Sequence, residues 1–216
     1  MLVSRITVIG GTGYVGSAIV REAVSRGHEV TVFSRNAPAE PVEVTYVQGT
    51  VDDSEALATA IAGADAVVAS LSPRGDLAGR LRPAYRTVAG LAARSDARLC
   101  IVGGFSALRP APDAPRFVAG DDLPPQFKAE AEEVAAVLTD DLPGAPAELD
   151  WVFISPAAEF GAYTPGERLG RYRIGGEVAL FDDDGKSAIS GADFATAVVD
   201  LIEGGEHRRA HVGVAY

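Results

Sequence analysis

The fold of this chain is decided by Gly10-Gly11-Thr12-Gly13-Tyr14-Val15-Gly16, a turn near the start of its 216 residues. Residues 2–9 before the turn form an apolar run that predicts a buried strand. Residues 14–26 carry apolar side chains at helical spacing, with Gly27 as the expected C-terminal cap. The turn therefore joins a strand to a helix, where the amides of the helix N-terminus can face phosphate groups.

The alternation of strands and helices continues along the chain. Further strands are predicted at residues 29–33, 44–47, 66–69, 99–102, 151–154 and 210–215, and further helices at residues 54–62, 80–94, 126–138 and 192–202. Asp53 is the expected N-cap of the helix at 54–62. Such alternation is typical of an α/β fold whose parallel strands are joined by right-handed crossovers.

We therefore expect one domain, residues 1–216, with a Rossmann-type three-layer α/β fold and a doubly wound, mostly parallel sheet. Two long segments interrupt the alternation: residues 105–125, which hold five prolines, and residues 155–190, which are rich in Gly, Asp and Arg. Long loops in a compact domain are usually functional. These two segments are expected to contribute most of a small substrate region toward the C-terminus.

Composition and charge restrict the partners. The formal net charge of -11 and the pI near 4.7 disfavour binding to nucleic acid and to anionic membranes. The sequence has no signal-peptide pattern and no apolar run of membrane-spanning length, so a cytoplasmic protein, monomeric or homodimeric, is expected. Cys100 lies in an apolar run, which indicates a packing residue. An anionic cofactor would have to be held by a local positive feature.

The glycine turn fits the pattern G-x-G-x-x-G between a strand and a helix. Its first glycines permit a tight turn, Gly13 lets the backbone approach a pyrophosphate, and Gly16 allows the helix to pack closely on the strand. The alternative is a tight turn that binds no ligand. We predict that it holds a dinucleotide through Gly10, Thr12, Gly13, Tyr14, Val15 and Gly16.

Ser34-Arg35 follows the second predicted strand and bears on the choice of cofactor. An NAD site normally has Asp or Glu at this strand end, where the carboxylate bonds the ribose 2′-hydroxyl. A guanidinium can instead form a bidentate pair with a 2′-phosphate. The alternative is a solvated surface arginine. The sequence favours NADP(H) over NAD(H), with Ser34 and Arg35 as contacts.

Beyond these residues, the chain resembles the atypical, NAD(P)-binding short-chain dehydrogenase/reductases. The segments that match one branch are Ile101-Val102-Gly103-Gly104-Phe105-Ser106-Ala107-Leu108, Phe127-Lys128, Leu149-Asp150-Trp151, Ser155-Pro156-Ala157-Ala158, Ile189-Ser190 and Asp193-Phe194-Ala195. That branch contains the NADH-flavin reductases related to biliverdin reductase B. The resemblance covers essentially the whole chain and implies hydride transfer from NADPH to a flavin, a quinone or a similar small acceptor.

Three departures qualify the resemblance. No tyrosine is followed by lysine four residues later, so the Tyr-x-x-x-Lys pair of ordinary short-chain dehydrogenases is absent. Gly49-Thr50-Val51 stands where many relatives have Gly-Asp, which leaves the adenine contact to Thr50 or Val51. Ala157-Ala158 stands where biliverdin reductase B relatives have a histidine, which argues against bilin reduction.

Ligands of open α/β sheets bind beyond the carboxyl ends of the strands. This rule adds further cofactor contacts at Ser70, Leu71, Gly103, Gly104, Ser155 and Pro156. Ser106 is the candidate to bond the nicotinamide amide or a substrate carbonyl, and Lys128 the candidate to position the ribose or donate a proton. The alternatives are a turn-stabilising hydroxyl and an exposed surface lysine.

No metal site is expected, because the histidines lack acidic partners at ligand spacing. The three histidines, His28, His207 and His211, also lie away from the expected cleft. The leading hypothesis is an NADPH-dependent reductase that transfers hydride to a flavin, a quinone or a similar acceptor. The alternatives are a non-catalytic, NmrA-like NADP(H)-binding redox sensor and, less favoured, a sugar epimerase or dehydratase.

Overall fold

The computed structural model describes residues 3–37, 43–121 and 123–216. Within these ranges, eight strands form one sheet in the order β3-β2-β1-β4-β5-β6-β8-β7. The strands are β1 (Arg5–Ile9), β2 (Glu29–Ser34), β3 (Thr45–Gln48), β4 (Ala66–Ala69), β5 (Arg98–Val102), β6 (Trp151–Pro156), β7 (Arg173–Gly175) and β8 (Ala210–Ala215). All neighbouring strands are parallel except β7, which pairs antiparallel with β8.

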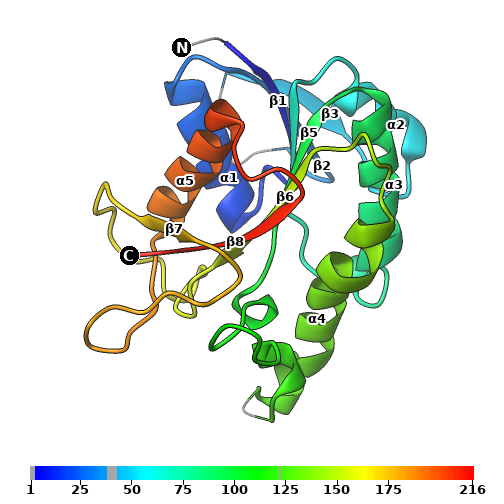
Figure 1. Ribbon diagram of the computed structural model, residues 1–216. Coiled ribbons are helices and arrows are strands. Elements are labelled where there is room, and N and C mark those ends of the chain that lie inside the picture. The colour runs from blue at the N-terminus through cyan, green and yellow to red at the C-terminus, as the bar shows by residue number, and fades with distance from the viewer. Residues whose placement is uncertain (1–2, 38–42, 122) are drawn as a thin grey trace.

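The helices cover both faces of the sheet (Figure 1). They are α1 (Tyr14–Ser25), α2 (Ser54–Ile61), α3 (Leu81–Arg94), α4 (Pro125–Ala136) and α5 (Gly191–Gly204). Helices α1 and α5 lie side by side on one face, and α2, α3 and α4 lie on the other. The strand order reverses between β1 and β4, which makes their carboxyl ends the topological switch point of the sheet. The predicted doubly wound, Rossmann-type α/β fold is confirmed.

Each face of the sheet has its own hydrophobic core. Phe33 and Phe153 are buried on the side of α2 and α3, and Phe194 of α5 is buried on the side of α1. All four residues of β4 are buried, as is typical of a central parallel strand. None of the helices in the described ranges is long and apolar enough to cross a membrane.

Most predicted element bounds agree with the structure to within a few residues, and three differences are informative. Strand β6 runs two residues past its predicted end, because Ser155 and Pro156 pair with β8. After α4, residues Val137–Asp141 form a π-helical turn that brings the Asp141 carboxylate to two arginines of α3, Arg82 and Arg86. The proline-rich segment 105–125 contains two 3-10 turns, Phe105–Ala107 and Phe117–Ala119. Leu2 of the first predicted strand lies outside the described residues.

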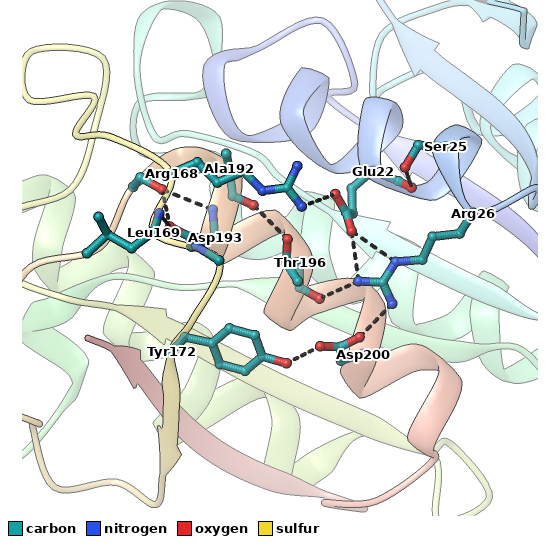
Figure 2. Close-up of polar contacts among 12 residues, drawn as sticks. Glu22, Ser25, Arg26, Arg168, Leu169, Tyr172, Ala192, Asp193, Thr196 and Asp200 are labelled. Atoms are coloured by element: carbon teal, nitrogen blue, oxygen red, sulfur yellow. Dashed lines mark hydrogen bonds and ion pairs between the residues drawn. The ribbon is translucent and has the colours of Figure 1, made fainter.

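Arg26 links α1 to α5 (Figure 2). Its guanidinium pairs with Glu22 on α1 at 2.8 Å and with Asp200 and Glu203 on α5 at 2.5 and 2.6 Å. The Arg26 side chain is only 16% exposed, and its carboxylate partners raise its pKa further above the ordinary value. Asp200 also accepts a hydrogen bond from Tyr172. This bond connects the segment just before β7 to the same cluster.

Replacing Arg26 should destabilise the fold much more than replacing an exposed arginine. Arg26→Ala removes the cation that three clustered carboxylates share, so we expect the free energy of unfolding to fall by about 3 kcal/mol. Arg5→Ala is the matched control, because the Arg5–Asp65 pair is exposed and should contribute little to stability. Urea unfolding at neutral pH measures both. Equal losses in the two variants would contradict this account of the α1–α5 contact.

Candidate functional site

The glycine turn after β1 brings α1 against the end of the strand. Gly10 has a φ of +81°, and a Cβ there would lie 2.3 Å from the Ser70 carbonyl oxygen. A Cβ on Gly16 would lie 2.2 Å from the Gly10 carbonyl oxygen. Both positions therefore exclude any side chain. Gly13 is the N-cap of α1 and has no side chain to cap it, so no capping side chain occupies the amides of the first helical turn.

A cavity of about 640 Å³ opens at the topological switch point. Of the predicted contacts, it is lined by Gly10, Thr12, Gly13, Ser34, Arg35, Thr50, Val51, Ser70 and Leu71. Four strand ends and the glycine turn thus meet at one site, as the carboxyl-end rule predicts. Tyr14, Val15 and Gly16 are in the first turn of α1 rather than in the lining. Their role as cofactor contacts stays a prediction.

The end of β2 is held in place by β3. The Ser34 hydroxyl donates to the Asn36 carbonyl at 2.7 Å, and the Tyr46 hydroxyl donates to the Ser34 carbonyl at 3.2 Å. The Gln48 amide donates to the Arg35 carbonyl at 3.0 Å. The Arg35 backbone is therefore fixed, while its side chain extends along the cavity wall.

The segment after β4 supplies residues that sequence reasoning missed. Arg74, Asp76 and Arg80 line the cavity from the side opposite β2 and β3. Arg80 pairs with Asp52 at 2.7 Å, and Arg74 pairs with Glu130 of α4 at 2.9 Å. Arg74 and Arg80, five and eleven residues past the end of β4, were the available signal, because the net charge of -11 makes local cations informative.

The two candidate catalytic residues lie outside the lining of this cavity. Ser106 is half-buried in the 3-10 turn after β5, and Lys128 is exposed in the first turn of α4. The ring of Phe105, next to Ser106, stacks on Phe117 with centroids 4.8 Å apart and meets Phe181 edge-on at 6.4 Å. These rings provide an apolar surface beyond β5, a further feature that sequence reasoning missed. The roles of Ser106 and Lys128 stay predictions.

Ser155 was predicted to contact the cofactor, but its hydroxyl is engaged inside the protein. Ser155 is fully buried in β6, and its Oγ lies 2.9 Å from both the Gly104 carbonyl oxygen and His211 Nε2. Arg116 lies 3.2 Å from His211 Nδ1 and can only donate, so Nδ1 accepts and Nε2 carries the hydrogen. Ser155 therefore donates to Gly104. This geometry makes Ser155 a support for the turn after β5, and its role as a cofactor contact stays a prediction.

His211 does not line the cavity, but its contact with Ser155 places it next to the turn after β5. Burial and the neighbouring Arg116 guanidinium lower the pKa of His211 to about 4. Arg116 also donates to the Ala107 carbonyl and pairs with Glu177 at 2.7 Å. The turn that carries Ser106 is thus held from below by the last strand.

The depressed pKa of His211 predicts a loss of stability in mild acid. The unfolded chain takes up the proton below about pH 6.5 and the folded chain only near pH 4, so the stability of the native state falls between these values. Between pH 7.5 and 5.0, His211→Gln should reduce this loss by about 1 to 2 kcal/mol. Urea unfolding at both pH values measures this change in the free energy of unfolding. His207→Gln is the control, because His207 is exposed. Identical pH dependence in His211→Gln and the parent protein would contradict the burial of a neutral His211.

Asp193, part of the Ile189–Ala195 match to the family, has a structural role. Its buried carboxylate accepts hydrogen bonds from the Leu169 and Gly170 amides and from the Tyr216 and Ser190 hydroxyls, and these bonds lower its pKa. Cys100 is buried, which raises its pKa to about 12. In the described part of the chain, no group of three or more His, Cys, Asp or Glu is placed to hold a metal ion.

The fold and the cavity define a Rossmann-type nucleotide-binding protein. A family model described as NAD(P)H-binding matches residues 10–204. The uncharacterized protein YwnB of Bacillus subtilis is 31% identical over 207 residues, which is 94% of each chain. The chain therefore belongs to the NAD(P)H-binding family, in agreement with the resemblance found in the sequence.

Two solved structures are similar over nearly their whole length. One, from Bacteroides thetaiotaomicron and provisionally described as an epimerase, has a TM-score of 0.88 at 30% identity and covers 100% of this chain and 98% of its own. The other is from Streptococcus pneumoniae and is provisionally described as an NADH-flavin reductase. It has a TM-score of 0.84 at 30% identity, and the match covers 98% of this chain and 99% of its own. The two descriptions differ in reaction class, so the overall fold does not decide between them.

Proposed function

We propose that the protein is an NADPH-dependent oxidoreductase that reduces a flavin, a quinone or a similar planar acceptor. The observation that carries the proposal is the single cavity that unites the glycine turn, the end of β2 with Arg35 and the loop after β4. A pyrophosphate needs unpaired amides, and a 2′-phosphate needs a guanidinium at the end of the second strand. Both features line this one cavity.

The residues present fit a dinucleotide. Gly13 leaves the N-terminus of α1 open to the pyrophosphate, and a Cβ on Gly13 would lie 3.3 Å from the Gly10 carbonyl oxygen. Thr50 and Val51 also line the cavity, and the resemblance implies that the adenine would be contacted there. When bound, the reduced nicotinamide supplies the hydride, so the protein has mainly to bind and align.

The acceptor would lie beyond β5. Phe105 and Phe181 offer aromatic faces there, and stacking favours a planar conjugated molecule. Ser106 would hold the nicotinamide amide or an acceptor carbonyl, and Lys128 would position the ribose. The Gly104–Ser155–His211 hydrogen bonds would keep the Ser106 turn in place for this task.

Two other functions remain as alternatives with distinct signatures. A redox sensor would bind NADP(H) without turnover. An epimerase or dehydratase needs a base on a substrate hydroxyl, and this chain lacks the tyrosine–lysine pair that supplies it in related enzymes. A planar acceptor needs no such base, which is why we favour the reductase.

Removing the Arg35 guanidinium should weaken NADPH selectively. We expect Arg35→Ala to raise the Kd of NADPH about 10- to 100-fold, because a charge-assisted pair with the phosphate is lost, and to change the Kd of NADH less than about threefold. Isothermal titration calorimetry measures both. Arg35→Lys keeps the charge without the bidentate geometry, so its Kd for NADPH should lie between those of the parent protein and Arg35→Ala. An unchanged NADPH Kd in Arg35→Ala would remove Arg35 from the site.

Turnover tests the reaction class. FMN, FAD or menadione should stimulate the oxidation of NADPH, which is followed as the loss of its absorbance at 340 nm. Ser106→Ala should lower kcat by about tenfold or more with little change in the Kd of NADPH. Tight NADPH binding with no turnover on any of these acceptors would support the redox sensor instead.

A further inference from the structure

The cavity contains a carboxylate at the end of β2 that does not come from β2. Asp76 lies in the 3-10 turn Gly75–Leu77 after β4, and its Oδ2 is 2.8 Å from Nη1 of Arg35. Both residues line the same cavity as Gly13 and Ser34. The loop after β4 therefore brings an acidic side chain to the guanidinium of Arg35, the residue that directly follows β2.

This place is where an NAD site needs its acidic residue. In such sites a carboxylate at the end of the second strand accepts a hydrogen bond from the adenosine ribose 2′-hydroxyl. Here β2 ends in Ser34 and continues to Arg35, so the strand itself supplies a cation. Asp76 adds the missing acceptor from a different segment, and the site carries both recognition groups.

We propose that Arg35 and Asp76 form a two-way ribose selector that lets the site accept NADH as well as NADPH. With NADPH, Arg35 pairs with the 2′-phosphate and releases Asp76. With NADH, Asp76 accepts from the 2′-hydroxyl while Arg35 still pairs with its other oxygen. The proposal rests on the proposed function, since it concerns the same dinucleotide site.

The geometry makes this exchange easy. The Arg35 and Asp76 side chains are 59% and 82% exposed, so their pair is solvated and contributes little to stability. Gly75 has a φ of +58°, and a Cβ there would meet nothing within 4 Å, so the turn has room to move Asp76 aside. By contrast, the neighbouring Arg74–Glu130 and Arg80–Asp52 pairs attach the rest of this segment to α4 and to the loop after β3.

The two cofactors should respond in opposite directions to removal of Asp76. In Asp76→Ala we expect the Kd of NADH to rise about five- to tenfold, because an acceptor for the 2′-hydroxyl is lost. The Kd of NADPH should stay unchanged or fall by up to about threefold, because Arg35 no longer has a competing anion. Asp76→Asn keeps a neutral acceptor and should weaken NADH less than Asp76→Ala does.

Calorimetric titration of both cofactors into the full chain measures these changes. Asp65→Ala is the matched control, because it removes the partner of another exposed arginine, Arg5, at the amino end of β1 and away from the cavity, and it should alter neither Kd. Weakened NADH with unweakened NADPH in Asp76→Ala supports the selector. Equal weakening of both cofactors, an unchanged NADH Kd, or parent protein that binds NADPH but not NADH would overturn the selector and leave the proposed function standing. Failure of the parent protein to bind either dinucleotide would overturn both.

Discussion

The close approach of α1 to the end of β1 is the constraint on which the rest of the site depends. Because Gly16 has no Cβ, the helix packs directly on the Gly10 carbonyl, and because Gly10 adopts a positive φ, the turn passes beside Ser70. The N-terminus of α1 is thereby directed to the switch point between β1 and β4. Any side chain at either glycine would push the helix away and remove the amides from the cavity.

Charge in this acidic protein is organised locally rather than globally. Each cavity arginine has a carboxylate partner from another segment: Arg35 with Asp76, Arg80 with Asp52 and Arg74 with Glu130. These pairs keep cations at the site despite the net charge of -11. In the proposed site, an incoming phosphate would exchange with a carboxylate instead of meeting a bare cationic surface, so cofactor affinity and selectivity would depend on the acidic partners as well as on the arginines.

Sequence patterns predicted the five helices, every strand except β7, and nine of the residues that line the cavity, because these depend on local periodicity and on the turn. The contacts of Ser155 and His211 could not be predicted, because they depend on β8 pairing with β6 more than fifty residues away. Asp76 was missed for the same reason. It pairs with Arg35, which follows β2 and is distant in the sequence, so no local pattern indicates the contact. Ser106 and Lys128 lie outside the lining of this cavity, in the 3-10 turn after β5 and in the first turn of α4.

A crystal structure of the NADP⁺ complex tests the central claim most directly. The account predicts the pyrophosphate within hydrogen-bond distance of the backbone amides that follow Gly13, with the adenosine 2′-phosphate on the Arg35 guanidinium. A dinucleotide bound elsewhere on the chain, or a pyrophosphate held by side chains away from the glycine turn, would contradict it.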